Sequence, residues 1–543
     1  MPDASNILAL AQNRPPIHTN PHKHKITVII FSGIEKSIHI VYTKPSLFYH
    51  NHENLRGGKH MFADEGIINL KHEVLNMVAK LAFEGKLEEE RDNIPYRIIP
   101  GPEPEFRCCI YKEREIIRQR VKLAEGKAPG EKDDGNVIQV IPSACADCPI
   151  ASYIITDNCQ NCLGKSCMNS CKFNAIKMDG KHPRIDPNHC RECGMCAKAC
   201  PFHVIVHLKR PCKSSCPVDA ITYDEHGISV IDDEKCIKCG QCIHKCPFGA
   251  IGSKTYIVDV INAIKSDRPV YALVAPAIEG QFENGITMAS WRKALKATGF
   301  TDMVEVGLGG DMTTSSEAEE WWEAHEKGER KTTSCCPAFV NMIRKHFPES
   351  ADLISTTVSP MCAVSRMIKA KEPDAYTVFI GPCIAKKSEV VDQKIEGNAD
   401  AVLAFSELHA IMLAVDTEHF DDVDGYQEAS KFGKRYGNAG GVTASVIEYL
   451  NETGRDGSAL SVCQVSGTTE CKKALLQLKV NKLKEDFIEG MACENGCVGG
   501  PSSYGVYPKF KKSRDDMIET ADARSITENL KNYDMASFSM HRE

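Results

Sequence analysis

The segments TSCCP (Thr333–Pro337), GPCIAKKSE (Gly381–Glu389) and EGMACENGCVGG (Glu489–Gly500) carry cysteines beside proline or glycine. Four of these cysteines can bind one metal centre only if the fold gathers all three segments. The pattern therefore predicts a centre held by a whole domain. The alternative is a set of inert thiols, because free cysteine is among the most buried residue types. Proline and glycine at these positions favour loops, and so favour the metal centre. The four candidate ligands are Cys336, Cys383, Cys493 and Cys497.

The three segments resemble, in the same order, the signature sequences of the iron-only (FeFe) hydrogenases, and the resemblance extends over residues 145 to about 540. It implies that the four ligands hold an H-cluster. This is a 4Fe–4S cubane joined through Cys497 to a di-iron unit that carries CO, CN and a dithiolate bridge. The resemblance also implies reversible interconversion of protons and electrons with dihydrogen, and a di-iron unit built by hydrogenase maturation proteins.

The resemblance further implies a proton path and two residues that contact the di-iron unit. Family members pass protons from a cysteine beside a cluster ligand through two glutamates and a serine. Here these positions are Cys335, Glu317, Glu320 and Ser355. The two glutamates lie three residues apart and would share one face of a helix, where simple solvation is the alternative role. Lys386 would hydrogen-bond a cyanide ligand, and Met491 would pack at the di-iron unit.

Six further residues fall where relatives line the cluster pocket: Pro276, Ala277, Pro360, Met361, Gly381 and Pro382. Two of them depart from the best-studied members, which have serine at position 277 and methionine at position 381. Relatives also carry Gly-Gly-Gly-Gln where this chain has VGGPSS, and many carry an N-terminal plant-type ferredoxin domain, which we expect this chain to lack. Such changes around a metal centre tune it. They indicate a divergent, group B-like branch. Cys362 lies nearby and is expected to be a packed core thiol or, alternatively, a redox thiol.

Sixteen of the 26 cysteines lie between Cys145 and Cys246, a density that indicates metal in a large chain without an export signal. Two ferredoxin-like runs come first. In such runs two 4Fe–4S cubanes form, and the fourth cysteine of each run binds the other cluster. The first predicted set is Cys159, Cys162, Cys167 and Cys200, and the second is Cys190, Cys193, Cys196 and Cys171. Zinc is the alternative metal for four thiolates. The Cys-Pro endings and the tandem runs favour cubanes.

A second ferredoxin-like unit follows, and its earlier cysteine run is incomplete. One predicted cubane has the ligands Cys216, Cys236, Cys239 and Cys242. The remaining thiols are two short of a set unless an upstream Cys-x2-Cys pair joins them. That fourth predicted set is Cys145, Cys148, Cys212 and Cys246. We expect this last cluster to be the one nearest the active site.

Composition limits the class of protein. The chain has 543 residues, 42% hydrophobic content and a net charge of −7, so it holds several domains and has no basic footprint for nucleic acid. No apolar run approaches the roughly 18 residues of a membrane span, and the first residues lack a signal-peptide layout. We expect a cytoplasmic protein that binds neither membrane nor nucleic acid.

We expect a multidomain α/β and α+β architecture. Its predicted parts are an N-terminal module with a linker (1–136), a ferredoxin-like domain for two clusters (137–208), a second cluster unit (209–254) and a two-lobed α/β catalytic domain (255–543). Apolar patterns predict strands over 25–33, 38–43, 270–277, 376–383 and 461–466, and helices over 67–84, 112–125 and 288–298. MVEVGLGGD (303–311) predicts a strand that ends in a glycine turn, and YGNAGGV (436–442) a glycine turn into a helix.

The leading interpretation is an FeFe-hydrogenase whose electrons pass through four accessory 4Fe–4S clusters to a soluble ferredoxin. A sensory or regulatory hydrogenase of low turnover is the first alternative, because the changed surroundings of the cluster are compatible with slow turnover. A non-catalytic, hydrogenase-like iron–sulfur assembly protein is the second. Retention of Cys335, Lys386 and all four central ligands favours the enzyme.

Overall fold

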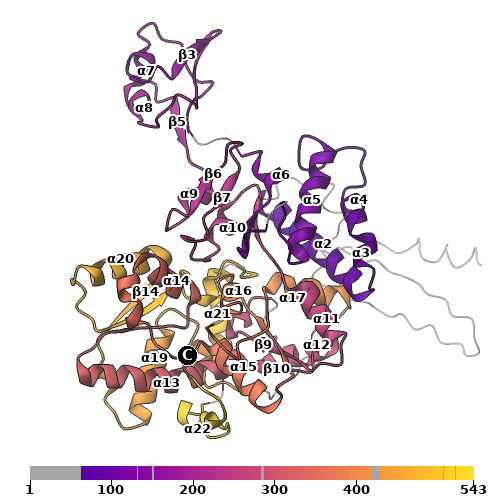
Figure 1. The fold of residues 1–543 in the computed structure, drawn as a ribbon, viewed down its shortest axis with the longest axis vertical. Helices are drawn as coiled ribbons and strands as arrows, with labels where there is room; N and C mark the ends of the chain where they lie inside the picture. The colour runs from indigo at the N-terminus through magenta and orange to yellow at the C-terminus, as the bar shows by residue number, and fades with distance from the viewer. Residues whose placement is uncertain are drawn as a thin grey trace, which may run out of the picture. The chain divides into compact units, whose positions relative to one another are not determined.

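A computed structural model describes residues 63–542, apart from gaps at 131–132, 149–151, 283–285, 393, 419, 421–422, 424, 426, 506, 520 and 522. The described chain mixes helices with small β-sheets, as Figure 1 shows. The strands expected over 25–33 and 38–43 lie outside the described residues. None of the described helices is long and apolar enough to cross a membrane.

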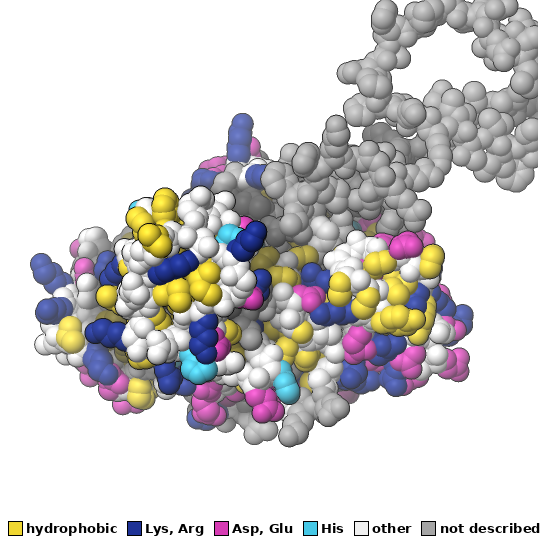
Figure 2. Space-filling model, turned by 90° about the horizontal axis from the view of Figure 1, so that it is seen from above, with side chains coloured by type: hydrophobic (Ala, Val, Ile, Leu, Met, Phe, Trp, Pro, Cys, Tyr) yellow, Lys and Arg dark blue, Asp and Glu magenta, His cyan; other side chains and the backbone are white. Residues whose placement is uncertain are grey.

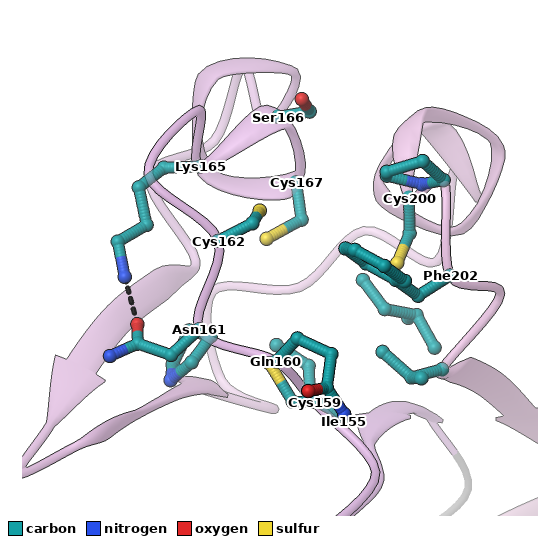
Figure 3. Close-up of a pocket in the computed structure, with 14 residues that line it drawn as sticks. Ile155, Cys159, Gln160, Asn161, Cys162, Lys165, Ser166, Cys167, Cys200 and Phe202 are labelled. Carbon is teal, nitrogen blue, oxygen red and sulfur yellow. Dashed lines mark hydrogen bonds between the residues drawn. The ribbon is translucent and has the colours of Figure 1, made fainter.

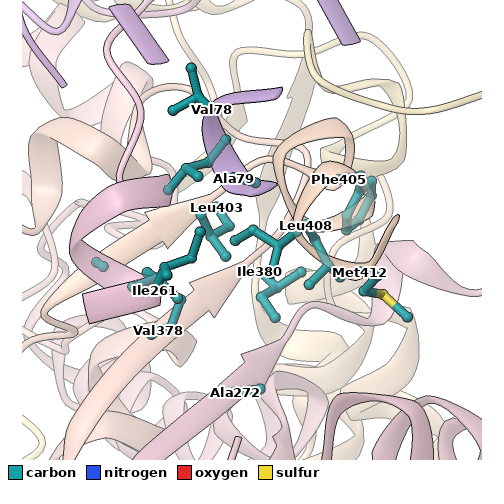
Figure 4. Packing of buried hydrophobic residues seen from close by; sticks show 14 of the residues in the cluster. Val78, Ala79, Ile261, Ala272, Val378, Ile380, Leu403, Phe405, Leu408 and Met412 are labelled. Carbon is teal, nitrogen blue, oxygen red and sulfur yellow. The ribbon is translucent and has the colours of Figure 1, made fainter. Parts of the chain in front are cut away.

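The first described elements are four helices: α2 (Ala63–Phe83), α3 (Leu87–Glu90), α4 (Ile94–Ile98) and α5 (Ile110–Ala124). The helices predicted over 67–84 and 112–125 are therefore confirmed as α2 and α5. Helix α2 packs on α11 (Ile257–Ile264) and α17 (Phe405–Ala414). Its Val78 and Ala79 share one apolar cluster with Ile261 and Leu408 (Figure 4). This helix is thus part of the core formed by residues after 255.

Residues 152–208 form a small lobe with the two-fold pattern of a dicluster ferredoxin. Strand β2 pairs antiparallel with β5, and β3 pairs antiparallel with β4. The elements are β2 (Ser152–Ile155), α7 (Ser166–Asn169), β3 (Ile176–Asp179), β4 (His182–Ile185), α8 (Met195–Ala199) and β5 (Ile205–Leu208). Each short helix carries a cysteine of a predicted cluster set.

The next unit uses chain from both sides of that lobe. Strand β1 pairs antiparallel with β8, so residues 138–148 belong with 209–254 and not with 152–208, where the predicted boundary at residue 137 had put them. The physical reason is that the ladder to β8 gives β1 its hydrogen-bond partners. The elements are β1 (Ile138–Val140), α6 (Pro142–Cys145), α9 (Pro211–Ser214), β6 (Ile221–Tyr223), β7 (Ser229–Ile231), α10 (Gln241–Lys245) and β8 (Ile251–Ser253).

Two parallel sheets organise the region after residue 255. The four-stranded sheet has the order β10-β9-β12-β13, and the three-stranded sheet has the order β11-β15-β14. Their strands are β9 (Val270–Val274), β10 (Asp302–Glu305), β11 (Lys331–Thr332), β12 (Tyr376–Ile380), β13 (Ala401–Leu403), β14 (Val462–Ser466) and β15 (Phe487–Met491). The strands predicted at β9, β12 and β14 are confirmed, although β9 and β12 end three residues early.

Helices connect and cover these sheets. Besides α11 and α17 they are α12 (Met288–Thr298), α13 (Val306–Lys327), α14 (Pro337–His346), α15 (Pro360–Lys371), α16 (Lys386–Glu389), α18 (Lys431–Arg435), α19 (Gly441–Glu452), α20 (Thr468–Lys479), α21 (Tyr507–Glu519) and α22 (Ile526–Leu530). Two short 3-10 turns also matter below, η2 (Pro276–Ile278) and η5 (Cys497–Gly499). The predicted helix over 288–298 is confirmed, as is the glycine turn before α19.

The turn predicted within residues 303–311 was wrong. The strand ends at Glu305, and α13 begins at once and runs through the three glycines. A Cβ at Gly309 would lie 2.2 Å from the Pro360 carbonyl oxygen, and one at Gly307 would lie 2.7 Å from Cβ of Ala429. The glycines are therefore needed for close helix packing, which overrides their low helix propensity.

Candidate functional site

The cysteines of the three signature segments all follow parallel strands. Cys335 and Cys336 follow β11, Cys383 follows β12, and the last pair follows β15. Cys336 is also the residue before α14, which starts with Pro337. Loops beyond the carboxyl ends of parallel strands are where open α/β folds place their sites. The fold thus gathers three distant segments.

The four predicted central ligands influence one another electrostatically. Burial first, and then the Cys336 and Cys497 thiols, raise the pKa of Cys383 to about 12. Burial and then Cys383 and Cys336 raise the pKa of Cys493. Yet Cys497 is exposed and the other three thiols are half-buried. None of the four is fully buried, which argues against the alternative of inert, sealed thiols. Four converging sulfur donors fit a metal cluster, whose binding would displace their protons.

Backbone contacts hold the loop of Cys497 against its neighbours. The Cys497 amide donates to the Gly437 carbonyl at 2.7 Å, and the Ser502 amide donates to the Pro382 carbonyl at 3.1 Å. Gly496 has φ +81°, a left-handed conformation that glycine adopts without strain. A Cβ at Gly500 would lie 2.6 Å from the Pro382 oxygen. The glycines of the third segment therefore allow it to close on the second.

Lys386 lies at the start of α16 in a buried polar triad. Its Nζ donates to Ser359 Oγ at 2.8 Å and to Glu389 Oε2 at 2.6 Å. The Ser359 hydroxyl donates to Glu389 Oε1 at 2.5 Å. Two of the three ammonium donors are thus engaged. The side chain is fixed in place, and one N–H remains for a ligand.

Cys335 and Glu317 form the inner end of the predicted proton path. Burial first, and then the charge of Glu317, raise the pKa of the Cys335 thiol. Burial and the charge of Glu320 raise the pKa of Glu317 to about 8. The Tyr436 hydroxyl donates to Glu317 Oε2 at 3.1 Å, and Oε1 has no partner among the described residues. Both groups are therefore expected to be protonated near pH 7.

Glu320 and Ser355 meet at the outer end. The Ser355 hydroxyl donates to Glu320 Oε2 at 2.6 Å, and the Thr356 amide donates to Oε1 at 3.0 Å. Lys331 forms an ion pair with the same carboxylate at 3.2 Å. The predicted serine and second glutamate are thus in direct contact. Solvation alone, the alternative considered for the glutamate pair, does not describe this geometry.

The six predicted lining residues are confined to two strand ends and one helix start. Ala277 and Met361 are buried, as is Met491 at the end of β15. Gly381 is closed off by a neighbour, because a Cβ at this position would lie 2.6 Å from Cε1 of Phe379. The Phe379 ring therefore takes up space that a side chain at position 381 would need. Cys362 is fully buried in an apolar cluster, as expected for a core thiol.

Three functional neighbours were missed from the sequence: Tyr436, Phe379 and Arg514. Arg514 of α21 is 1% exposed. Its guanidinium donates to the Pro276 carbonyl at 3.1 Å and to Asn438 Oδ1 at 3.1 Å. It thereby links the turn η2 to the segment that binds the Cys497 loop. No motif marks these side chains. Tyr436 and Arg514 lie far from the signatures in the sequence, and Phe379 is one apolar residue of strand β12.

The accessory thiols gather in the predicted sets. One hollow of about 390 Å³ is lined by the first set, and Figure 3 shows these sulfur atoms around it. Two further hollows, of about 300 and 290 Å³, are lined by the second and fourth sets. In the remaining set, burial first, and then Cys239, Cys236 and Cys216, raise the pKa of Cys242. In the described ranges, no three His, Cys, Asp or Glu side chains converge on a single ion.

The predicted order of the clusters was wrong in one respect. The set nearest the central site contains Cys239, not Cys246. Cys239 packs with Cys336 and Cys383 around Ala338, Ala385 and Ala492. The reason is that the loop before α10 docks directly on the signature segments. A Cβ at Gly240 would lie 2.8 Å from Cγ of Pro501.

Comparisons with known proteins agree with this geometry. Residues 268–501 match the family model "Iron only hydrogenase large subunit, C-terminal domain". Residues 268–501 belong to the iron-only hydrogenase family. Upstream, residues 158–204 match a 4Fe–4S dicluster domain and residues 206–257 match the LdpA Fe–S cluster-binding domain. The hydrogenase domain thus follows a ferredoxin-like 4Fe–4S region.

Individual relatives are distant. The chain is 27% identical to iron hydrogenase 1 of Clostridium pasteurianum over 62% of this chain and 68% of that protein. It is 27% identical to the NADP-reducing hydrogenase subunit HndD of Solidesulfovibrio fructosivorans, over 51% of this chain and 57% of the relative. An FeFe-hydrogenase structure from Chlamydomonas reinhardtii has a TM-score of 0.42 at 20% identity, over 52% of this chain and 98% of that one.

A protein of another functional class also matches, over a shorter stretch. It is a probable cytosolic Fe–S cluster assembly factor of Brugia malayi. It is 26% identical over 31% of this chain and 47% of its own length.

Proposed function

We propose that the hydrogenase domain interconverts protons and electrons with dihydrogen at an H-cluster bound by the four central cysteines. One observation carries this proposal. Four thiols from three distant segments lie close enough to influence one another electrostatically, beside a fifth thiol, Cys335, whose pKa is raised by burial and then by the charge of buried Glu317. A structural cluster needs only the four ligands. The fifth thiol and its carboxylate are what proton chemistry at the same place requires.

When bound, an H-cluster supplies the redox-active metal at which dihydrogen is made or split. The residues of the chain hold and surround it. Cys336, Cys383, Cys493 and Cys497 provide the thiolates. Lys386, fixed by Ser359 and Glu389, offers its remaining N–H to an anionic ligand of the group. The buried Met491 closes the apolar side of the site.

Protons are proposed to move between the site and the surface along the four residues of the predicted path. The raised pKa of Cys335 keeps its thiol protonated, so Sγ can hold the proton to be delivered. Glu317 has a raised pKa and accepts from Tyr436, which orients its carboxyl. Glu320 and Ser355 continue the path outward through their 2.6 Å hydrogen bond. Each group both accepts and releases a proton, as a relay needs.

Electrons are proposed to pass through four accessory 4Fe–4S clusters, one for each set of cysteines. The set containing Cys239 adjoins the central site. The set containing Cys212 shares an apolar cluster with the set of Cys239. The two sets of the 152–208 lobe would hold the other two clusters of the proposed electron path. Thiolate ligation in tandem runs is typical of such clusters.

We also propose a soluble, acidic ferredoxin-type carrier as the electron partner. The 152–208 lobe has seven Lys and Arg residues against four Asp and Glu residues, whereas the whole chain has a net charge of −7. Leu163, next to the ligand Cys162, is fully exposed. Hydrophobic and basic side chains are mixed on the face seen in Figure 2. Opposite charge would steer an acidic carrier to this lobe. The cytoplasmic location stays a prediction.

An infrared spectrum of the anaerobically matured protein tests the proposal. Bands in the CO and CN stretching region, together with hydrogen evolution from a reduced carrier, are the expected result. Cys335→Ser should keep the bands and lose most of the turnover, because it removes the proton-holding thiol and leaves the ligands intact. Absence of bands after full cluster loading and competent maturation would contradict the proposal and favour the assembly-protein alternative.

Low turnover in the presence of CO and CN bands would favour the sensory alternative. The altered pocket is the observation behind that possibility, since Ala277 and Gly381 both lack the side chains seen in well-studied relatives. Wild-type and Cys335→Ser rates measured together separate a slow intrinsic rate from a blocked proton path. A rate that is already low and is unaffected by the substitution supports sensing.

A further inference from the structure

A buried arginine lines the hollow formed by Cys145, Cys148, Cys212 and Cys246. Arg210 is 3% exposed and lines this hollow. Its Nη1 lies 3.8 Å from Cys145 Sγ as a donor, and its Nη2 donates to the Cys148 carbonyl at 3.2 Å. The guanidinium also stacks over the Tyr223 ring, 4.5 Å from its centroid. It is thus held with its charge directed at the thiols.

A second buried arginine lies near Cys246, on a helix that precedes the four cysteines in the sequence. Arg120 of α5 is 6% exposed, and its Nη2 donates to the Gly249 carbonyl at 2.6 Å. Its Nε has no hydrogen-bond partner in the described part of the chain. Burial lowers its pKa to about 10, and the charges that act on it are the Cys246 thiol and Arg107. A buried cation in such surroundings is costly unless an anionic group compensates it.

Side chains as well as backbone amides form hydrogen bonds with the thiols of this set. The Ser229 amide donates to Cys145 Sγ at 3.4 Å. The Ser229 hydroxyl lies 3.5 Å from Cys145 Sγ and 3.8 Å from Cys212 Sγ. Within the described residues, the thiols of the other accessory sets are bonded by backbone amides, such as Glu192 to Cys190 at 3.4 Å. Side-chain donors distinguish the fourth set.

Positive charge and hydrogen bonds to sulfur both favour the reduced form of an iron–sulfur cluster. Reduction adds one negative charge to a group that is already anionic. A nearby buried cation interacts strongly with that added charge, because little water screens it. Net charge, hydrogen bonds to sulfur and exposure are the terms that set the reduction potential. In this hollow the buried cation and the hydrogen bonds to sulfur favour reduction, and they outweigh burial, which opposes the added charge.

We propose that this cluster has the highest reduction potential of the four accessory clusters and is the first to be reduced. The inference rests on the proposed function, which assigns a cluster to these four cysteines. In the step, one electron leaves the reduced carrier, which is oxidised, and enters the cluster without any bond being formed or broken. The cluster holds that electron beside the set of Cys239, one step from the central site.

The helices over 63–124 support the site of this cluster. Arg120 reaches the cluster from α5, and Arg107 precedes that helix and donates to the Phe248 carbonyl at 3.2 Å. Lys112 and Arg107 also pair with Asp147, between the two upstream ligands. The helices thus fix the Cys145–Cys148 loop and supply its positive surroundings.

A redox titration of the full chain, followed by electron paramagnetic resonance, tests this inference. The protein is produced without maturases, so that the di-iron unit does not contribute. In Arg210→Gln the highest-potential reduction step should move to a more negative potential with the iron content unchanged. Arg210→Lys keeps the charge and should move it less. Lys472→Gln is the matched control, because Lys472 donates to the Pro217 carbonyl beside another set and should leave this step in place.

The double variant Cys145→Ala/Cys148→Ala identifies the signal. It should lose about four irons per chain and the highest-potential step together. Unchanged iron would show that the proposed fourth cluster is absent, which is a failure of the proposed function. Full iron in Arg210→Gln with the highest step unmoved would overturn the inference alone. Loss of a lower-potential step in the double variant would overturn it as well.

Discussion

The Tyr436 hydroxyl donates to Glu317 Oε2 at 3.1 Å, and the backbone of the next residue, Gly437, accepts from the Cys497 amide at 2.7 Å. One short segment therefore contacts both the inner carboxyl of the proposed proton path and the loop of the fourth central ligand. Proton delivery and ligand position are coupled through this segment.

Tyr436→Phe tests the first half of that coupling. The variant keeps the ring in its apolar surroundings but removes the side-chain donor to Glu317 Oε2. An unsatisfied buried group costs about 1–3 kcal/mol, so misorientation of the carboxyl should slow hydrogen evolution by roughly tenfold. The infrared bands should stay unchanged. An unaltered rate would show that Tyr436 does not position Glu317.

Glu317→Gln tests the protonation state of that carboxyl. Its folded pKa is raised to about 8, well above the ordinary value of 4.5. The folded chain therefore keeps a proton that the unfolded chain has released between these two values, so its stability falls as pH rises toward 8 and then levels. Glutamine has no proton to lose and should flatten this dependence. Thermal unfolding between pH 6 and 9, under anaerobic conditions, measures it.

The control for that prediction is Glu319→Gln, two residues away on α13. Glu319 is 45% exposed and pairs with Arg455, so the wild-type pH dependence should persist. Turnover should also separate the two variants, with a fall of about 100-fold or more for Glu317→Gln because general acid–base groups contribute that much. If stability depended on pH with the same slope in both variants, the raised pKa of Glu317 would be contradicted.

Local patterns in the sequence predicted the parts of the fold that depend on neighbouring residues. The amphipathic helix α2, the strand that delivers Cys383 and the turn before α19 all have such patterns. The errors have long-range causes. The glycines of α13 are explained by Pro360, far along the chain, and β1 is explained by its partner β8. A pattern of adjacent residues shows neither of these long-range contacts.

The residues of the candidate site also divide into those that local patterns predict and those that depend on long-range packing. Within the 152–208 lobe, cysteine spacing grouped the thiols that line each hollow. The central set was predicted from the family resemblance, and the fourth set from the thiols that remained. Tyr436 and Arg514 carry no signature, and only tertiary packing brings them to the site. The order of the clusters failed for a related reason, since spacing assigns ligands to sets but does not say which set touches the signature loops.

Gly381 and Phe379 should behave as a compensating pair. A Cβ at position 381 would lie 2.6 Å from Cε1 and 2.7 Å from Cζ of Phe379. Gly381→Met alone should therefore destabilise the domain by roughly 1–3 kcal/mol through overpacking. Adding Phe379→Ala removes the ring and should recover stability, which a double-mutant cycle of anaerobic thermal unfolding measures. Strictly additive effects would contradict the contact.

Lys387 should be essential to the join between the hydrogenase domain and the neighbouring cluster unit. Its side chain is 1% exposed and pairs with Glu407 at 2.6 Å. The same Nζ donates to Ser253 Oγ at 3.1 Å and to the Lys254 carbonyl at 2.8 Å, at the end of β8. Lys387→Met leaves Glu407 buried and uncompensated, at a cost of about 3–5 kcal/mol.

Thermal unfolding of the cluster-loaded chain measures this cost, and the first transition should fall by on the order of 10 °C. The matched control is Lys327→Met on α13, whose pair with Glu323 spans 3.5 Å and is 59% and 68% exposed. An exposed pair contributes little, so its transition should barely move. Lys387→Met/Glu407→Leu removes both charges and should recover part of the loss. Equal transitions for the two lysine variants would show that the Lys387 contact does not join the units.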